Sequence, residues 1–287
     1  MIVSIILIRY AEIGLKSRPV RTRFERQLKD NIVFMLSSAG IEALVRRENA
    51  RLYVETDRIE QAILVLKRVF GIASLSVAEV CTSAMEDLCA KAATYSIGRI
   101  RKGQSFAVCA RREGQQPYSS IDVGREVGAA ILMANCDKGI RVNLGHPDVS
   151  FFIEVRDRKA YLFTSYVYCH AGLPLGSQGS VLAEVDDDRG VLSAWLMMKR
   201  GCRVYIRGQG DLSLLRNYDH RLKVAEALPT GRKAILGYVL GTRASDIRSV
   251  DVTKYGLPVF FPTIGMTDGD VRAYLDRLVW ECPANSR

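Results

Sequence analysis

The order of predicted strands and helices in the first 81 residues limits the possible folds of this chain more than any other feature. The opening apolar, β-branched segment is typical of a buried strand. Ser17 and Pro19 mark the start of a helix, and Gly40 follows its end. The resulting pattern, β-α-β-β-α-β, is that of a ferredoxin-like domain. The predicted elements are strands over residues 2–9, 41–47, 51–56 and 73–81 and helices over residues 17–39 and 58–69.

A second unit of helices and strands is predicted for residues 82–170. Ser83 is the expected cap of its first helix, and Ser120 or Asp122 that of its second. The last two strands alternate aromatic and polar residues on either side of a two-residue turn, which indicates a hairpin. The predicted elements are helices over residues 83–100 and 120–134 and strands over residues 104–111, 149–156 and 159–168.

A glycine-rich stretch then separates these units from a third one. In the third unit strands alternate with helices, which indicates a parallel sheet covered on both faces. The chain as a whole is therefore predicted to be an α/β protein with an α+β N-terminal half. The predicted segments are 1–81, 82–170, a linker over 171–180, and 181–287; the last holds strands over 181–185, 202–207, 233–240 and 258–261 and helices over 189–200, 217–228 and 268–280.

The composition narrows the class of protein. With 48% hydrophobic and 25% charged residues, the chain is neither disordered nor collagen-like. The sequence contains no apolar run of the roughly 20 residues that a membrane-spanning helix needs, and its start lacks the features of a secretory signal. We therefore expect a soluble cytoplasmic protein without a membrane partner. The net charge of +10 favours a polyanion such as nucleic acid.

Cysteine and histidine spacing argues against a metal centre. The chain has 7 Cys and 3 His, but no two cysteines have the spacing of a CxxC pair. We expect no metal site.

Eight segments together resemble the tRNA 4-thiouridine synthase family, whose members are also called tRNA sulfurtransferases. The resemblance runs through residues 1–205 and resumes near the C-terminus. The segments are EIGLKSRPVRTRFERQLKDNI (12–32), KGQSFAVCARREG (102–114), SSIDVGREVGAAI (119–131), HPDVSFFIEVRDRKAYLF (146–163), GLPLGSQGSVL (172–182), LMMKRGCRV (196–204), LGYVLGTRASDIRSV (236–250) and LPVFFPTIGMTDGDV (257–271).

The resemblance implies a domain plan and an activity. It implies a ferredoxin-like domain, a THUMP RNA-binding domain and a PP-loop ATP-pyrophosphatase domain, here truncated. In this family the first two domains hold the acceptor end of a tRNA. The third adenylates a uridine so that persulfide sulfur can replace its oxygen. If the chain is an active enzyme, its cofactors are ATP and Mg²⁺. The resemblance implies tRNA as a partner; a sulfur donor or partner enzyme and a second copy of the chain are partners that the sequence leaves open.

The segment at the expected phosphate-binding loop departs from the family pattern. The family has an SGGxDS-type loop, whose glycines let backbone N–H groups surround pyrophosphate. The corresponding residues here form an acidic run, and carboxylates repel phosphate at close range. A Mg²⁺ ion could bridge them, or the run could simply be a solvated turn that caps a helix. We predict that the loop does not bind ATP as the family's loop does; its residues are Val185, Asp186, Asp187, Asp188, Arg189 and Gly190.

A sulfurtransferase also needs a reactive thiolate. By resemblance Cys282 is a weak candidate for a catalytic cysteine, whereas Cys202 starts a strand and is expected to be buried. The sequence therefore assigns no catalytic residue.

The first candidate RNA-binding cluster lies around the start of the first helix. Cations on the face opposite Phe24 and Leu28 could contact phosphates. The alternative is a solvated face with pairs such as Glu25 with Lys29. The resemblance favours RNA; the candidates are Lys16, Arg18, Arg21 and Arg23, with Arg26 and Lys29 nearby.

The second candidate cluster lies in the THUMP-like unit. An arginine pair at a strand end can grip phosphate, and the helix start that follows can bind an anion. Tyr118 could stack on an unpaired base, or it could pack as an ordinary half-buried residue. By resemblance these residues form the THUMP signature; they are Arg111, Arg112, Tyr118, Ser119, Ser120 and Arg125.

Several functions remain open from the sequence. The leading hypothesis is a tRNA-binding protein whose ATP-pyrophosphatase domain has lost its reaction. The second is an active enzyme that makes 4-thiouridine with a rearranged loop and an external sulfur donor. A THUMP-type methyltransferase is disfavoured, since no glycine-rich strand-to-helix turn follows residue 180. A protein scaffold that does not touch RNA is the fourth.

Overall fold

The computed structural model describes residues 4–48, 50–225 and 234–281, which form two compact units. The first unit contains residues up to Ile8, Tyr53–Glu55 and Leu75–Val167. The second contains Arg9–Leu52, Thr56–Ser74 and the residues from Tyr168 onward. The two helices of the ferredoxin-like segment therefore group with the C-terminal residues. None of the helices in the described ranges combines the length and apolar character needed to cross a membrane.

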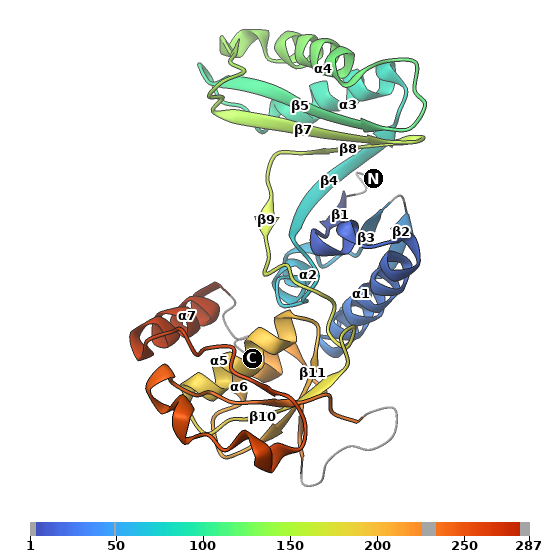
Figure 1. Ribbon diagram of the computed structural model, residues 1–287. Coiled ribbons are helices and arrows are strands. Elements are labelled where there is room, and N and C mark those ends of the chain that lie inside the picture. Colours follow the sequence, from blue (N-terminus) through green and yellow to red (C-terminus); the bar gives the residue numbers. More distant parts are fainter. Residues whose placement is uncertain (1–3, 49, 226–233, 282–287) are drawn as a thin grey trace. The chain divides into compact units, whose positions relative to one another are not determined.

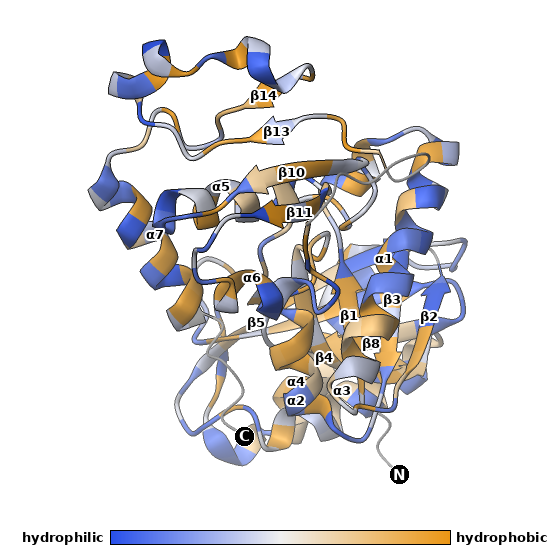
Figure 2. Cartoon of the chain, turned by 90° about the horizontal axis from the view of Figure 1, so that it is seen from below, coloured by the Kyte–Doolittle hydropathy of each residue, from blue (hydrophilic) through white to orange (hydrophobic). Residues whose placement is uncertain are grey.

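A nine-stranded sheet runs through the N-terminal part of the chain (Figure 1). Its strand order is β2-β3-β1-β4-β8-β7-β5-β6, and β9 pairs with β4. Only one of the five side chains of edge strand β2 is buried, and its last three residues are the charged Arg46, Arg47 and Glu48 (Figure 2). The strands are β1 (Ser4–Arg9), β2 (Leu44–Glu48), β3 (Arg51–Glu55), β4 (Ser74–Thr82), β5 (Ser105–Glu113), β6 (Arg141–Val142), β7 (Val149–Arg156), β8 (Lys159–Phe163) and β9 (Val167–Tyr168).

The helices of this part follow the predicted order. Ser17 is the N-cap of α1, as predicted, and Gly40 adopts a left-handed conformation just past its end. The predicted cap at Ser83 was wrong: α3 has Ala84 at its N-cap, and the Thr82 hydroxyl accepts the Ala84 N–H. The helices are η1 (Glu12–Leu15), α1 (Arg18–Ser38), α2 (Ile59–Leu66), α3 (Met85–Ile97), α4 (Ser120–Ala134) and η2 (Cys136–Lys138).

The THUMP-like unit has its own core. Helices α3 and α4 cover one face of β5 and β7 (Figure 1), and Leu88, Phe106 and Val127 are buried between them. Strands β5 and β7 are parallel, and β7 and β8 form the predicted hairpin. The predicted strand over 159–168 is interrupted, because β8 ends at Phe163 and the chain leaves it to pair with β4 as β9.

The second unit contains a five-stranded parallel sheet with the order β12-β11-β10-β13-β14, which confirms the predicted parallel sheet. The predicted helix over 217–228 was wrong. Helix α6 ends at Tyr218, and the Asp219 carboxylate accepts the Arg221 N–H to form a turn before β12. Residues 226–228 lie outside the described residues. The elements are β10 (Ser180–Glu184), α5 (Asp188–Lys199), β11 (Arg203–Arg207), α6 (Ser213–Tyr218), β12 (Lys223–Val224), β13 (Tyr238–Val239), η4 (Ala244–Ser249), η5 (Val252–Tyr255), β14 (Val259–Phe260) and α7 (Asp268–Glu281).

The core of the second unit is built around Trp195 of α5, which is fully buried. Phe70, which follows α2, packs against it with ring centroids 5.3 Å apart and stacks on Tyr218 at 5.1 Å. His170 donates to or accepts from the Tyr218 hydroxyl at 2.9 Å, and burial lowers the pKa of this histidine to about 4. A segment far upstream in the sequence therefore completes the C-terminal core.

The stretch 171–180, predicted as a linker, is held by backbone hydrogen bonds. The Gly71 N–H donates to the Ala171 carbonyl, and the Leu173 N–H donates to the Lys199 carbonyl. Gly172 has a φ of +78°, and a Cβ atom there would lie 2.3 Å from the Lys199 carbonyl oxygen. Only glycine fits this close approach, which explains the glycine better than chain flexibility does.

Candidate functional site

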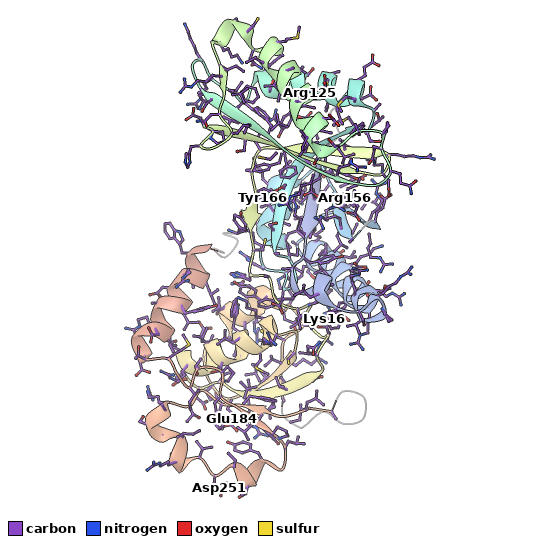
Figure 3. All side chains as sticks on the ribbon, turned by 45° about the horizontal axis from the view of Figure 1, so that its top comes forward. Lys16, Arg125, Arg156, Tyr166, Glu184 and Asp251 are labelled. Atoms are coloured by element: carbon purple, nitrogen blue, oxygen red, sulfur yellow. The ribbon has the colours of Figure 1, made fainter. Side chains whose placement is uncertain are left out.

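The first candidate site lies at the point in the parallel sheet where the strand order reverses, next to β10. Strand β10 has β11 on one side and β13 on the other, so the loops after β10 and β13 diverge and leave a crevice. A cleft of about 410 Å³ lies there. Its walls include Glu184, Asp187, Gly241, Asp251 and Lys254, and Figure 3 labels Glu184 and Asp251. This is the usual ligand position in an open parallel sheet, but its carboxylates outnumber its cations.

Two of the three consecutive aspartates after β10 hold the loop in place. Asp186 accepts the Gln209 N–H at 3.0 Å. Asp187 is the N-cap of α5 and accepts the Gly190 N–H at 2.8 Å. Asp188 begins the helix and is exposed. An N–H group that could otherwise face a phosphate is thus bonded to the chain's own carboxylate.

Two glycines allow the backbone segments behind this loop to pack closely together. A Cβ atom on Gly190 would lie 2.7 Å from the Glu184 carbonyl oxygen. A Cβ atom on Gly241 would lie 2.6 Å from the Gly190 nitrogen. Both positions require glycine, because the loop after β13 packs directly on the start of α5.

Arg189 points into the protein and away from solvent. Its side chain is only 2% exposed. It donates to the Thr263 and Met266 carbonyls at 2.9 Å each and to Asp268 at 2.7 Å. These bonds fix the two terminal nitrogens of the guanidinium to residues at and before the start of α7, whereas its buried Nε has no hydrogen-bond partner among the described residues.

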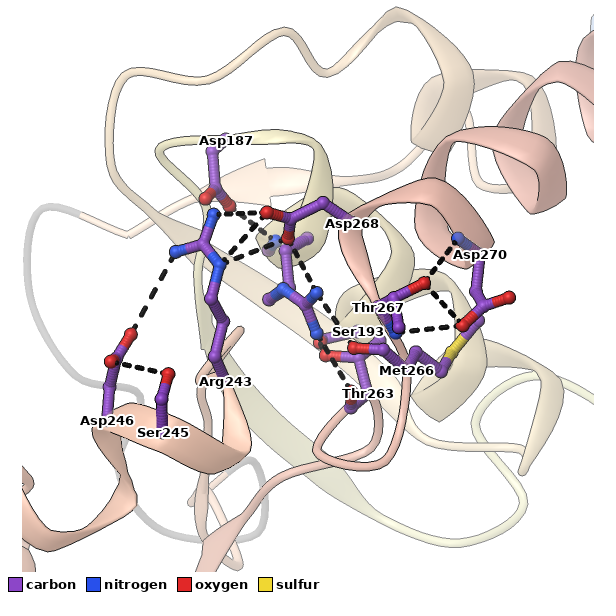
Figure 4. A network of polar contacts seen from close by, with 12 residues as sticks. Asp187, Ser193, Arg243, Ser245, Asp246, Thr263, Met266, Thr267, Asp268 and Asp270 are labelled. Carbon is purple, nitrogen blue, oxygen red and sulfur yellow. Dashed lines mark hydrogen bonds and ion pairs between the residues drawn. The ribbon is translucent and has the colours of Figure 1, made fainter.

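Asp268 also binds Arg243 (Figure 4). The Arg243 Nε lies 3.1 and 3.2 Å from the two carboxylate oxygens, and a second nitrogen lies 3.1 Å away. Hydrogen bonds from Arg189 and Arg243 lower the pKa of Asp268. This bridge borders a second cleft, of about 510 Å³, that also includes Asp187 and Arg272.

The cysteine predictions have different outcomes. Cys282 lies outside the described residues. Cys202 is buried, as expected, and burial raises the pKa of its thiol. In the parts of the chain that the structure describes, no three His, Cys, Asp or Glu side chains are grouped as metal ligands.

The first basic cluster surrounds the start of α1. Lys16, labelled in Figure 3, and Arg18 and Arg23 are exposed, while Arg21 is half-buried. The first turn of α1 contains no acidic residue, and the Ser17 hydroxyl makes no capping bond. Cations at a helix N-terminus oppose its dipole, so this arrangement suits an external anion better than it suits the helix alone.

The expected ion pair of Glu25 with Lys29 is replaced by another contact. Glu25 is buried, accepts the Tyr10 hydroxyl, and pairs with Arg47 at 3.3 Å. The Glu25 carboxylate is therefore bonded to Tyr10 and Arg47 and does not neutralise the exposed cations at the start of α1.

The second basic cluster lies at the end of β5. Arg111 and Arg112 are both exposed. Arg112 donates to the Gly114 carbonyl at 2.8 Å and to the Gln116 side chain at 3.3 Å. Tyr118 is half-buried against the THUMP-like core, and its hydroxyl donates to the Ser83 carbonyl. Its packing and this bond agree with the second possibility given for Tyr118, that of an ordinary half-buried residue.

The start of α4 completes this cluster. Its N-cap is Ser119, one residue before the predicted Ser120, and Ser119 and Asp122 cap each other reciprocally. Hydrogen bonds from Ser119 lower the pKa of Asp122. Arg125, labelled in Figure 3, lies 3.2 Å from Asp122 and is 69% exposed.

Some residues of these sites were not predicted from the sequence. Thr263, Met266 and Asp268 reach the loop after β10 from nearly 80 residues further on. Leu15 is 88% exposed beside the first basic cluster, and Ile121 is 79% exposed beside the second. The acidic Asp-Gly-Asp sequence at the start of α7 was the signal available for Asp268, and it did not indicate that Asp268 pairs with Arg189.

Domain and protein comparisons agree with this arrangement. Residues 5–76 match the ThiI ferredoxin-like domain, and residues 82–165 match the THUMP domain. A probable tRNA sulfurtransferase of Methanosarcina acetivorans is 40% identical over 205 residues, which is 70% of this chain and 50% of that protein. This chain is related to the tRNA sulfurtransferases.

Another such relative, from Thermococcus kodakarensis, is 34% identical over 233 residues, or 77% of this chain and 60% of its own length. The chain thus spans about half the length of the curated tRNA sulfurtransferases it matches.

Two solved structures share the fold. A crystal structure from Pyrococcus horikoshii has a TM-score of 0.82 and 28% identity, and covers 96% of this chain and 99% of its own. The structure of a 4-thiouridine synthetase in complex with RNA and ATP has a TM-score of 0.74 at 19% identity, covering 99% of this chain and 91% of that one. The second likeness concerns the fold alone.

Proposed function

We propose that this chain binds tRNA through its ferredoxin-like and THUMP-like segments and that its C-terminal domain does not adenylate the RNA. The proposal takes its tRNA partner from the relationship to the tRNA sulfurtransferases. Its physical support is the pair of exposed basic clusters, at the start of α1 and at the end of β5. Such cations bind phosphates and displace counterions.

The main support for the second part of the proposal, the absence of adenylation, is the hydrogen bond from the Gly190 N–H to the Asp187 carboxylate. ATP would have to displace a carboxylate from the helix start and then lie beside Asp186 and Asp188. Arg189 is turned inward and cannot compensate, because it is held by Asp268 and two carbonyls. The residues of this loop do not fit ATP in the manner of a glycine-rich loop.

The second candidate function is an active tRNA sulfurtransferase with an altered loop. The cleft of about 410 Å³ at the carboxyl ends of β10 and β13 favours it, because ligands bind there in parallel sheets. That reading needs an external sulfur donor. It would also require Mg²⁺ to shield the aspartates, with the whole β10–α5 loop adopting another conformation.

Calorimetry with ATP and a gene deletion separate the candidates, and a tRNA titration tests the binding that both share. Titration of the purified chain with tRNA should give salt-dependent binding, and calorimetry with Mg²⁺-ATP should give no heat of binding. Micromolar ATP affinity that is lost on Asp188→Ala substitution would instead favour the second candidate. As a cellular measurement, deleting the gene should leave thiolated uridine in bulk tRNA.

A further inference from the structure

A groove of about 410 Å³ lies at one edge of the C-terminal sheet, along β11 and β12. Tyr205 of β11 is in register with Lys223 of β12. Because side chains alternate along a strand, Arg203 lies on the same face as Tyr205. Arg221 lies in the turn before β12 and lines the same groove as Lys223. Val204 and Ile206 point the other way, into the core around Trp195.

The cations of this groove differ from others in the same domain. Arg207 lies 3.8 Å from Glu184, and Lys254 lies 3.7 Å from Asp251. Within the described part of the chain, Arg203, Arg221 and Lys223 have no carboxylate within ion-pair distance. Three cations therefore line one groove without an internal counter-charge.

Two of these side chains differ from freely solvated surface cations. The Arg221 guanidinium lies 3.7 Å from the centre of the Phe34 ring, a cation–π contact. The Arg203 Nε is buried and has no hydrogen-bond acceptor among the described residues. A guanidinium that is partly desolvated and unneutralised binds an incoming anion more strongly than a solvated one.

We propose that this groove binds the phosphate backbone of an RNA strand, with the Tyr205 ring as an apolar wall for a base. Residues two apart on a strand are separated by about 6.6 Å, and neighbouring strands by about 4.8 Å. The cations are therefore spread along the groove, which suits repeated charges better than one phosphate ion. Interleaved cations and aromatic rings are typical of surfaces that bind single-stranded nucleic acid. The inference rests on the proposed tRNA binding and adds a contact in the C-terminal domain.

The test compares two charge-matched double variants of the full chain. Arg221→Gln/Lys223→Gln removes two groove cations, and Arg248→Gln/Arg277→Gln removes two exposed cations outside the groove. Binding of tRNA and of a single-stranded octanucleotide is measured between low and physiological salt. We expect the groove variant to lose about fivefold in affinity and its log–log salt slope to fall by about 1 to 2. The control variant should change less than twofold.

Because Arg221 also contacts Phe34, the single variant Lys223→Glu provides a second readout that leaves this contact intact. Equal losses in groove and control variants, with Lys223→Glu unchanged, would overturn the groove assignment while leaving tRNA binding in place. Failure of the unmodified chain to bind tRNA would instead overturn the proposed function and this inference with it. Full competition by micromolar inorganic pyrophosphate would assign the groove to a small phosphate ligand and overturn the RNA assignment.

Discussion

The starts of α4 and α5 have similar capping geometry and opposite electrostatics. Each helix follows a strand and a loop, and in each the N-cap side chain accepts an N–H from the first turn. Around α4 the neighbouring arginines are exposed. Around α5 three aspartates are exposed, and Arg189, the arginine of the β10–α5 loop, is buried. The comparison teaches that two helix starts with the same capping geometry can differ in the charges that flank them, and we expect these charges to decide whether an anion binds.

The largest expected effect concerns the buried arginine. Arg189→Met keeps the volume of the side chain but leaves the Thr263 and Met266 carbonyls without their donors. We expect the second unit to lose about 3 kcal/mol of unfolding free energy. Urea unfolding followed by tryptophan fluorescence measures this, since both tryptophans, Trp195 and Trp280, lie in that unit.

Arg243→Met is the control for this prediction. Arg243 pairs with the same Asp268, but on the exposed side, where an ion pair contributes little. Equal shifts of the unfolding midpoint in the two variants would show that burial of Arg189 is not what holds the loop.

Charge reversal tests the basic cluster beside the start of α4. Arg111→Glu/Arg112→Glu should weaken tRNA binding about 30-fold at low salt, or about 2 kcal/mol, because phosphate contacts become repulsive. Filter binding at several salt concentrations measures the loss. Arg243→Glu/Arg272→Glu makes the same charge change beside α5 and should leave tRNA affinity nearly unchanged. Similar losses in both would remove the functional difference between the two helix starts.

The two caps themselves should be equivalent. Ser119→Ala and Asp187→Ala each remove one capping bond and should each cost about 1 kcal/mol. Hydrogen exchange of the amides in the first turns of α4 and α5 reports each loss separately. A much larger loss for Asp187→Ala would mean that the aspartate does more than cap its helix.

The smallest effect on stability is expected when the pH is lowered. The pKa values of Asp122 and Asp268 are both lowered, by Ser119 and by Arg189 with Arg243 respectively. Each carboxylate thus stabilises the fold above its unfolded pKa of about 3.9, and this contribution is lost as the pH falls through the lower folded value. Melting temperatures of Asp122→Asn and Asp268→Asn should depend less steeply on pH between about 5 and 2 than those of the unmodified chain. An unchanged slope in both variants would contradict the assignment.

Local signals explain where the sequence-based prediction succeeded. The helix now called α4 was predicted over 120–134 and is observed over Ser120–Ala134, because capping residues and apolar spacing both lie within it. The predicted helix over 217–228 failed because Asp219 turns the backbone after one short helix. Such a side-chain turn competes with helix formation and has little signature in hydrophobic spacing.

The sequence alone determined the order of the longer elements, the basic clusters and the acidic run after β10, since these depend on residue types and short-range spacing; the two-residue strands β6 and β12 were not predicted, nor was β9 as a strand separate from β8. Only the tertiary structure decided that Phe70 belongs to the C-terminal core, that Arg189 faces inward to Asp268, and that three cations share a groove along β11 and β12. These facts depend on contacts between residues far apart in the chain, and no periodic pattern encodes such contacts.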